Sequence, residues 1–343
     1  MTPQKLNIVK FLELSEQLPV IDVRSPSEFM TGHIPGARNI PLFNDEERAI
    51  VGTIYKKAGR TPAILEGLKL TGPSMEKKLK EALNIATREK LLVHCWRGGM
   101  RSETMAWLFS LAGMDVHILD GGYKSYRHYI LDKLSEKKKI IILGGLTGSS
   151  KTQIIDHLKS LDQQVVDLEG LANHKGSAFG ALGQLPQPST EQFANILYDK
   201  WKKINPDIPV WLEDESKNIG TVFLPDTFYE NMQKAPAIIL MMDAKTRLPR
   251  LIREYSGFPK EELIASVLKI SRRLGGDNTK EAISAIEAED FQKAIEITLT
   301  YYDKTYLFGL NRKSSDNIIY VKTETDDIEE NSAKVLEAAG KIR

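Results

Sequence analysis

The stretch that decides the fold of the first half of the chain is Leu91-Leu92-Val93-His94-Cys95-Trp96-Arg97-Gly98-Gly99-Met100-Arg101-Ser102. Its first three residues predict a short buried strand, and the run 103–111 predicts a helix, so Cys95 lies on a strand-to-helix loop. Backbone N–H groups and the positive end of the helix would then point at the sulfur and favour its thiolate form. The alternative is an inert buried side chain, which is the common state of a lone cysteine.

The residues around Cys95 favour a reactive role. Two arginines in the loop would attract an anionic donor, and two glycines would let the loop curl tightly round the sulfur. Core packing explains neither pair. We therefore predict Cys95 as the catalytic residue, and as its donor-binding loop Trp96, Arg97, Gly98, Gly99 and Arg101.

Short apolar runs separated by helix-length segments extend this pattern in both directions, which predicts parallel α/β sheets. The first block has two further runs, at 20–23 and 117–119. The second has runs at 140–143, 165–166, 210–212, 237–242 and 318–321, with a mostly helical stretch at 244–310. Residues 133–139 carry five charges and predict a linker. The expected fold class is α/β with two parallel-sheet domains, at 1–132 and 140–343, the second ending in a mostly helical part.

The composition fits such a protein. The chain has 343 residues, of which 41% are hydrophobic and 27% charged, as in globular proteins. One cysteine excludes an internal disulfide framework, and we find no signal peptide and no apolar run long enough to cross a membrane. The six histidines lack ligand-like spacing, which argues against structural zinc. We expect a cytoplasmic protein with no membrane partner.

A second motif, Gly145-Leu146-Thr147-Gly148-Ser149-Ser150-Lys151-Thr152, follows the strand expected at 140–143 and precedes a helix-like run. This is the context of a phosphate-binding P-loop, whose amides wrap a phosphate while Lys151 neutralises it. The Thr152 hydroxyl is the candidate ligand for Mg²⁺. Ser150 stands where the pattern expects glycine, and it would weaken the loop if a positive φ is needed there. The predicted diphosphate-binding residues are Gly145, Thr147, Gly148, Ser149, Ser150, Lys151 and Thr152.

Other polar residues could complete this second site. Acidic residues end two of the expected strands and could hold Mg²⁺ or its waters, although acids at a strand end also form solvated turns. The stretch 244–273 has eight Lys or Arg against three Glu; it could meet phosphates or be a solvated helical face. Phe179 and Tyr255, like Trp96, could contact a ligand or pack in the core. The further candidates are Asp167, Glu169, His174, Glu213, Glu215, Arg272 and Arg273.

Taken together, these motifs resemble a known family. Residues 22–29 and 32–41, with the loop at 95–102, are similar to rhodanese domains, in which the cysteine carries a persulfide or its selenium equivalent. With the P-loop, the whole chain resembles bacterial tRNA 2-selenouridine synthases. The stretches that carry this likeness are 51–56, 119–127, 167–180 and 213–220.

The resemblance implies a two-step modification of 2-thiouridine at the wobble position of tRNA. Geranyl diphosphate first alkylates the sulfur, and selenium from selenophosphate then replaces the geranylated sulfur. The P-loop suits the diphosphate of the first step, and Cys95 suits the selenium donor of the second. No tightly bound cofactor is implied; the expected partners are tRNA and the two small-molecule donors.

Two alternatives stay open from the residues alone. In one, the P-loop hydrolyses ATP or GTP to power a rhodanese-type sulfurtransferase. In the other, a degenerate P-loop makes the chain a non-catalytic anion sensor, against which the intact cysteine loop argues. Without a second cysteine, a chalcogen on Cys95 would have to leave to an external acceptor or reductant.

Overall fold

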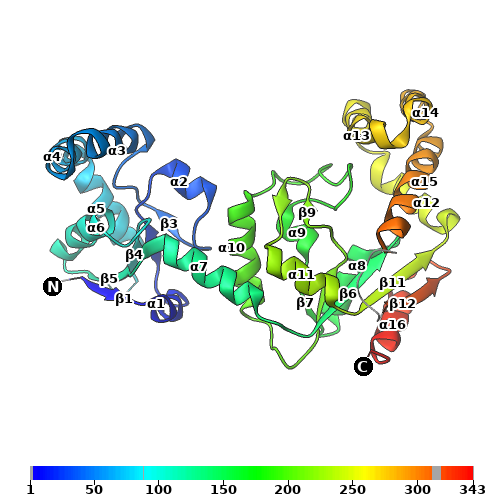
Figure 1. The fold of residues 1–343 in the computed structure, drawn as a ribbon, viewed down its shortest axis with the longest axis horizontal. Helices are drawn as coiled ribbons and strands as arrows, with labels where there is room; N and C mark the ends of the chain where they lie inside the picture. The colour runs from blue at the N-terminus through cyan, green and yellow to red at the C-terminus, as the bar shows by residue number, and fades with distance from the viewer. Residues whose placement is uncertain (1–2, 88, 311–317, 343) are drawn as a thin grey trace. The chain divides into compact units, whose positions relative to one another are not determined.

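The computed structural model describes residues 3–87, 89–310 and 318–342. The chain forms two compact units, Met1–Lys133 and Leu134–Arg343. Each is built round its own five-stranded parallel sheet (Figure 1). The expected fold class, two parallel-sheet α/β domains, is confirmed.

The sheet of the first unit has the strand order β1-β5-β4-β2-β3, with every neighbouring pair parallel. Its central strand β4 is apolar and fully buried over residues 91–93, because helices cover both faces of such a sheet. The strands are β1 (Gln4–Leu6), β2 (Val20–Asp22), β3 (Arg38–Asn39), β4 (Lys90–His94) and β5 (Asp115–Leu119). The helices are α1 (Ile8–Ser15), α2 (Pro26–Thr31), α3 (Asp45–Ala58), α4 (Arg60–Thr71), the 3₁₀ turn η1 (Gly72–Ser74), α5 (Met75–Ile85), α6 (Met100–Leu111) and α7 (Gly122–Ser135).

Helices α3 and α4 form a helical hairpin between β3 and β4 (Figure 1). Helix α3 begins with a capping box in which Asn44 and Glu47 satisfy each other's backbone N–H groups. Gly59 separates the two helices at a φ of 88°, a left-handed conformation that favours glycine. The hairpin is therefore a defined feature of the fold rather than a loose insertion.

Helix α7 extends to Ser135, so the first three residues of the expected linker are helical. Strand β6 begins at Ile140 as expected, and residues 136–139 remain outside any helix.

The sheet of the second unit has the order β12-β11-β6-β8-β7 and is also parallel, with β6 at its centre. Its strands are β6 (Ile140–Gly145), β7 (Gln164–Val165), β8 (Val210–Glu213), β11 (Ala237–Met242) and β12 (Ile318–Thr323); β9 (Asn218–Ile219) and β10 (Val222–Phe223) form a separate antiparallel pair. The helices are α8 (Lys151–Ser160), α9 (Leu168–Ala172), α10 (Thr190–Trp201), α11 (Asp226–Lys234), α12 (Ala244–Tyr255), α13 (Lys260–Leu274), α14 (Gly276–Glu287), α15 (Phe291–Leu310) and α16 (Ile328–Ala339).

Helices α12 to α15 fill the stretch 244–310, which confirms the helical part expected there. Helices α13, α14 and α15 share an apolar core of their own, separate from the core under the sheet. Both sequence motifs follow the central strand of a sheet, where parallel folds gather their binding sites. In the described ranges, none of the helices combines the length and apolar character needed to cross a membrane.

Candidate active sites

The cysteine loop leaves the carboxyl end of β4 and enters α6 through Gly98 and Gly99. Gly98 has a φ of 65°, and a Cβ there would lie 2.4 Å from the carbonyl oxygen of Leu119. Gly122 has a φ of 60°, and its Cβ would lie 2.4 Å from the nitrogen of Gly98 and 2.5 Å from the carbonyl oxygen of Cys95. Both glycines are required because two backbone segments approach each other this closely.

The start of α7 holds this loop in place. The backbone N–H of Tyr123 donates to the carbonyl of Cys95 at 2.8 Å, and that of Lys124 donates to Trp96 at 3.0 Å. The cysteine loop is thus bonded to a helix that follows the neighbouring strand β5.

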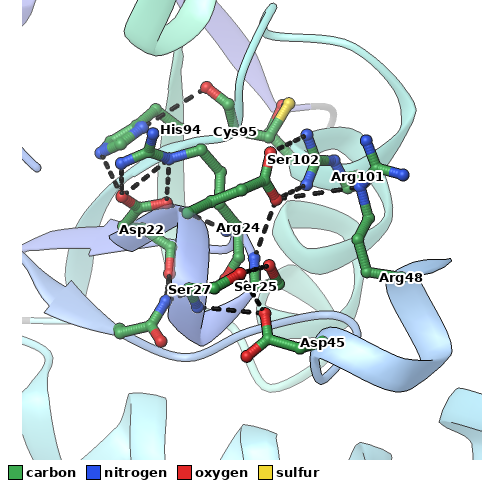
Figure 2. A network of polar contacts seen from close by, with 12 residues as sticks. Asp22, Arg24, Ser25, Ser27, Asp45, Arg48, His94, Cys95, Arg101 and Ser102 are labelled. Atoms are coloured by element: carbon green, nitrogen blue, oxygen red, sulfur yellow. Dashed lines mark hydrogen bonds and ion pairs between the residues drawn. The ribbon is translucent and has the colours of Figure 1, made fainter. Parts of the chain in front are cut away.

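Ser102 lies next to the sulfur, as Figure 2 shows. Its hydroxyl is 3.2 Å from Cys95 Sγ and donates to the carbonyl of Gly99 at 2.9 Å. A hydroxyl rotates freely, so the same group can donate to a thiolate once Cys95 loses its proton. Cys95 itself is 3% exposed.

Arg101 is already paired with a carboxylate and is not available to bind an anion. Its guanidinium donates to Glu28 at 2.6 and 3.3 Å (Figure 2). Burial alone would raise the pKa of Glu28, but the ion pair with Arg101, aided by Arg48, lowers it below its usual range. Arg97 is exposed and has no ion-pair partner in the part of the chain that the structure describes.

Asp22 and Arg24 belong to a buried network behind the loop (Figure 2). Asp22 accepts from Arg24, whose Nη2 lies 2.6 Å from its Oδ2, and Arg24 also donates to the carbonyl of Gly32. The Arg24 guanidinium lies 3.8 Å from the centre of the Tyr123 ring. This network ties β2 and α2 to the start of α7, and it does not line the cavity at Cys95.

Cys95 opens into a cavity of about 900 Å³. All the predicted loop residues except Gly98 line it, and the opposite wall comes from the hairpin α3–α4. Gly98 lies behind the loop, against β5 and α7.

The P-loop of the second unit joins β6 to α8. Its seven predicted residues, 145 and 147–152, all line one cavity of about 730 Å³. Lys151 Nζ lies 3.0 Å from the carbonyl oxygen of Gly145, so the lysine folds back over the loop. Helix α8 begins at Lys151 without a side-chain cap, which leaves its first N–H groups available to an anion.

Ser150 does adopt a positive φ, of 67°. For a residue with a Cβ this conformation costs roughly 1–2 kcal/mol. Its hydroxyl donates to Asp326 at 2.9 Å, and Arg250 Nε donates to the same carboxylate oxygen at 2.8 Å. This bonding offsets the backbone strain.

Tyr306 contacts the P-loop, although the sequence gives no sign of it. Its hydroxyl accepts from the N–H of Gly145 at 2.8 Å and donates to Asp214 at 2.9 Å. Burial and the charge of Asp214 raise the pKa of Tyr306 well above its usual value, so it remains a donor.

The predicted acidic residues divide into two groups. Glu169 and Glu215 line the cavity, and Thr152 donates to Glu169 at 3.2 Å. Burial and the charge of Glu169 raise the pKa of Glu215. Glu213 and Asp167 instead cap α9: Glu213 accepts from the N–H of Leu168, and Asp167 from that of Gly170.

The remaining candidates also divide. Arg273 lines the cavity, whereas neither Arg272 nor His174 does. His174 is almost buried, and burial together with the charge of Lys269 lowers its pKa.

Part of the basic stretch 244–273 forms contacts inside the unit. Buried Arg247 pairs with Asp303 at 2.5 Å and donates to the carbonyl of Thr147. Lys175 also lines the cavity, paired with Glu254 at 2.5 Å.

A small apolar pocket adjoins the P-loop cavity. It lies among α12, α13, α14 and α15 and includes Phe179, Phe291 and Leu299. The two spaces share the lining residues Thr147, Ser177, Leu251, Tyr255 and Tyr302. An anion-binding loop and an apolar pocket therefore lie side by side.

Two family models match successive parts of the chain. Residues 138–338 match the family described as tRNA 2-selenouridine synthase AAA domain, and residues 8–129 match the rhodanese-like domain. A tRNA 2-selenouridine synthase from Nitrosomonas europaea is 34% identical over 86% of this chain and 90% of its own. One from Shewanella frigidimarina is 36% identical over 90% of this chain and 92% of its own. A solved rhodanese-related protein from Thermoplasma volcanium is 22% identical, covering 37% of this chain and 92% of its own, with a TM-score of 0.25.

Proposed function

Because the chain belongs to the family of tRNA 2-selenouridine synthases, we propose that it converts 2-thiouridine at the tRNA wobble position to 2-selenouridine in two steps. The second unit attaches a geranyl group from geranyl diphosphate to the sulfur. The first unit then exchanges the geranylated sulfur for selenium from selenophosphate. Its substrate is a cytoplasmic RNA, and we expect the enzyme in that compartment.

The observation that carries the first step is the shared wall between the P-loop cavity and the apolar pocket. Geranyl diphosphate has a doubly charged head and a hydrocarbon tail, so its site needs both kinds of lining. The loop amides and Lys151 would bind the diphosphate. Phe179, Tyr255 and Tyr302 would contact the first carbons of the tail, since the pocket of about 40 Å³ holds only part of a geranyl chain. The thiouridine sulfur attacks C1 of the geranyl group, the C1–O bond breaks with its electron pair leaving on diphosphate, and N3 of the base gives up its proton to solvent.

The oxygen atoms near Lys151 suit Mg²⁺. Thr152 lies beside Glu169, and a Cβ on Gly176 would lie within 3.1 Å of carboxylate oxygens of both Glu169 and Glu215. Oxygen donors of this kind fit Mg²⁺, which keeps several waters and the substrate's phosphates as further ligands. Within the described ranges, no three His, Cys, Asp or Glu are grouped to hold a metal by themselves. Thr152 and Glu169 would hold the ion only together with diphosphate, whose charge the ion would neutralise.

The second step is redox-neutral. Selenium in selenophosphate has the same −2 oxidation state as the sulfur it replaces, so a perselenide on Cys95 would need an added oxidant. Instead, the Cys95 thiolate attacks C2 of the geranylated base and expels geranylthiolate, which takes up a proton. Selenide, released from selenophosphate when water takes the phosphoryl group, then attacks C2 and expels Cys95.

Paired variants test the division of labour. Cys95→Ala should form geranylated tRNA at the normal rate and no 2-selenouridine, whereas Lys151→Ala should lose at least tenfold in geranylation and still selenate pre-geranylated tRNA. Mass spectrometry of the nucleosides from 2-thiouridine tRNA measures both products. Loss of geranylation alone in Cys95→Ala would overturn the assignment. ATP turnover by the wild type, without any geranylation, would instead favour the sulfurtransferase.

A further inference from the structure

The cavity at Cys95 is larger and more apolar than a selenium donor requires. Its volume of about 900 Å³ is at the upper end of the roughly 300–1,000 Å³ of small-molecule sites. Selenophosphate is a compact, highly charged ion that gains nothing from hydrocarbon walls. The apolar lining comes from both sides of the cavity and includes Phe43, Val51, Tyr55, Ile64, Leu68 and Met100.

Several of these side chains are only partly covered by the protein. Leu68 on α4 is 56% exposed and Tyr55 on α3 is 58% exposed, although both belong to the cavity wall. Exposed apolar groups gathered round a reactive residue indicate a ligand-binding surface, because burying them against a ligand releases water.

The charges at the cavity are all of one sign. Five basic residues line it and, within the described part of the chain, no acidic residue does; the five are Arg48, Lys56, Arg60, Arg97 and Arg101. Glu28 pairs with Arg101 and lies 3.8 Å from Arg48. Lys56, Arg60 and Arg97 have no such partner among the described residues, and this leaves them able to bind phosphates.

We propose that this cavity binds the S-geranylated nucleotide of the tRNA. The geranyl chain lies against the hairpin α3–α4, the basic residues bind the neighbouring backbone phosphates, and C2 of the base faces Cys95. The proposal rests on the proposed function and adds a substrate-binding role for the hairpin. Its consequence is selectivity: the second step distinguishes a long apolar thioether from a short one.

In this arrangement the geranylthio group has two roles: it binds the tRNA to the apolar wall, and it is the group that Cys95 expels. Once it has taken up a proton and departed as neutral geranylthiol, the apolar wall beside Cys95 is free again. A 2-thiouridine that was never alkylated has nothing to place against α4, and it would bind only through its phosphates.

The test compares two substrates and two variants. The substrates are anticodon stem-loops carrying S-geranyl- or S-methyl-2-thiouridine, both of which have an alkylated sulfur that can leave. We expect wild-type kcat/KM for selenation to favour the geranyl substrate by at least tenfold, since even one methylene in an apolar pocket is worth about 10-fold or more. Leu68→Asp should lower kcat/KM for the geranyl substrate at least tenfold and change that for the methyl substrate by less than threefold.

Leu65→Asp is the matched control, because Leu65 lies on the same helix, is 64% exposed and does not line the cavity. It should keep the wild-type preference, and both variants should geranylate normally. Equal preference in the wild type, or equal effects of the two variants, would overturn the hairpin's role while leaving the two-step function intact. If the wild type selenates neither substrate, the proposed function itself fails.

Discussion

Ser150 holds a backbone conformation that usually requires glycine, and its hydroxyl bond to Asp326 offsets the strain. Ser150→Gly would remove both the strain and the bond, whereas Ser150→Ala would keep the strain and lose the bond. A hydrogen bond to a charged partner contributes about 1.5–3 kcal/mol. We therefore expect Ser150→Ala to raise KM for geranyl diphosphate and lower Tm more than Ser150→Gly does. Alanine matching or exceeding glycine in both assays would contradict this view of the loop.

Glu213 is fully buried, and Oε1 of its carboxylate has no hydrogen-bond partner among the residues that the structure describes. Burial and the charges of Asp167 and Glu169 raise its pKa well above the usual value. The folded state therefore favours the protonated form, and stability falls as the pH rises from the unfolded pKa through the folded one. Glu213→Gln mimics the protonated form, so it should raise Tm at pH 8 and leave it almost unchanged at pH 4.

Thermal unfolding followed across this pH range measures the difference, with the exposed Glu230→Gln as control. A shift of about 2–4 °C is expected for each kcal/mol in a domain of this size. A Glu213→Gln effect that is the same at every pH would rule out titration of this carboxyl as its cause.

At the scale of residues, sequence reasoning finds what is contiguous and misses what is not. The P-loop residues line one cavity and most of the cysteine-loop residues line another, because each set lies on one short loop. Tyr306 lies 161 positions after Gly145, and Glu28 lies 73 before Arg101. No local pattern indicates such partners, since they depend on how strands and helices pack.

At the scale of elements, the cysteine loop depends on the start of α7. A Cβ at Gly122 would collide with backbone atoms of Gly98, Cys95 and Arg97, none of which can move without displacing the loop. We expect Gly122→Ala to lower selenation at least tenfold and to leave geranylation unchanged. Gly72→Ala is the control, because a Cβ there meets nothing within 4 Å. Normal selenation by Gly122→Ala would show that the loop tolerates displacement.

The central strands of both sheets are predictable because they are continuous apolar runs buried on both faces. The sequence does not predict strand β1, because it is a three-residue edge strand, mostly exposed, that gains its structure by pairing with β5. Strand β3 has two residues and is likewise defined by its neighbour β2. The hairpin α3–α4 contains residues 51–56, whose only distinction in the sequence is their likeness to the family.

At the scale of the whole molecule, the two units have separate cores and separate sites. The geranylated tRNA made by one molecule can therefore be the substrate of another. From 2-thiouridine tRNA, Cys95→Ala should produce no 2-selenouridine and Lys151→Ala at most a tenth of the wild-type amount, whereas an equimolar mixture should produce clearly more than either variant alone. Replacing either partner in the mixture by the double variant should remove this gain. A mixture that shows no gain would mean that the intermediate passes between the units of one molecule.

The single cysteine also gives the enzyme a built-in reporter. Cys95 is the only thiol in the chain, and it lines the cavity bounded by α3–α4. Alkylation by iodoacetamide therefore marks one position, and its rate depends on whatever fills that cavity. Competition for the label would rank inhibitors, product analogues and modified oligonucleotides by affinity without selenium, radioactivity or turnover.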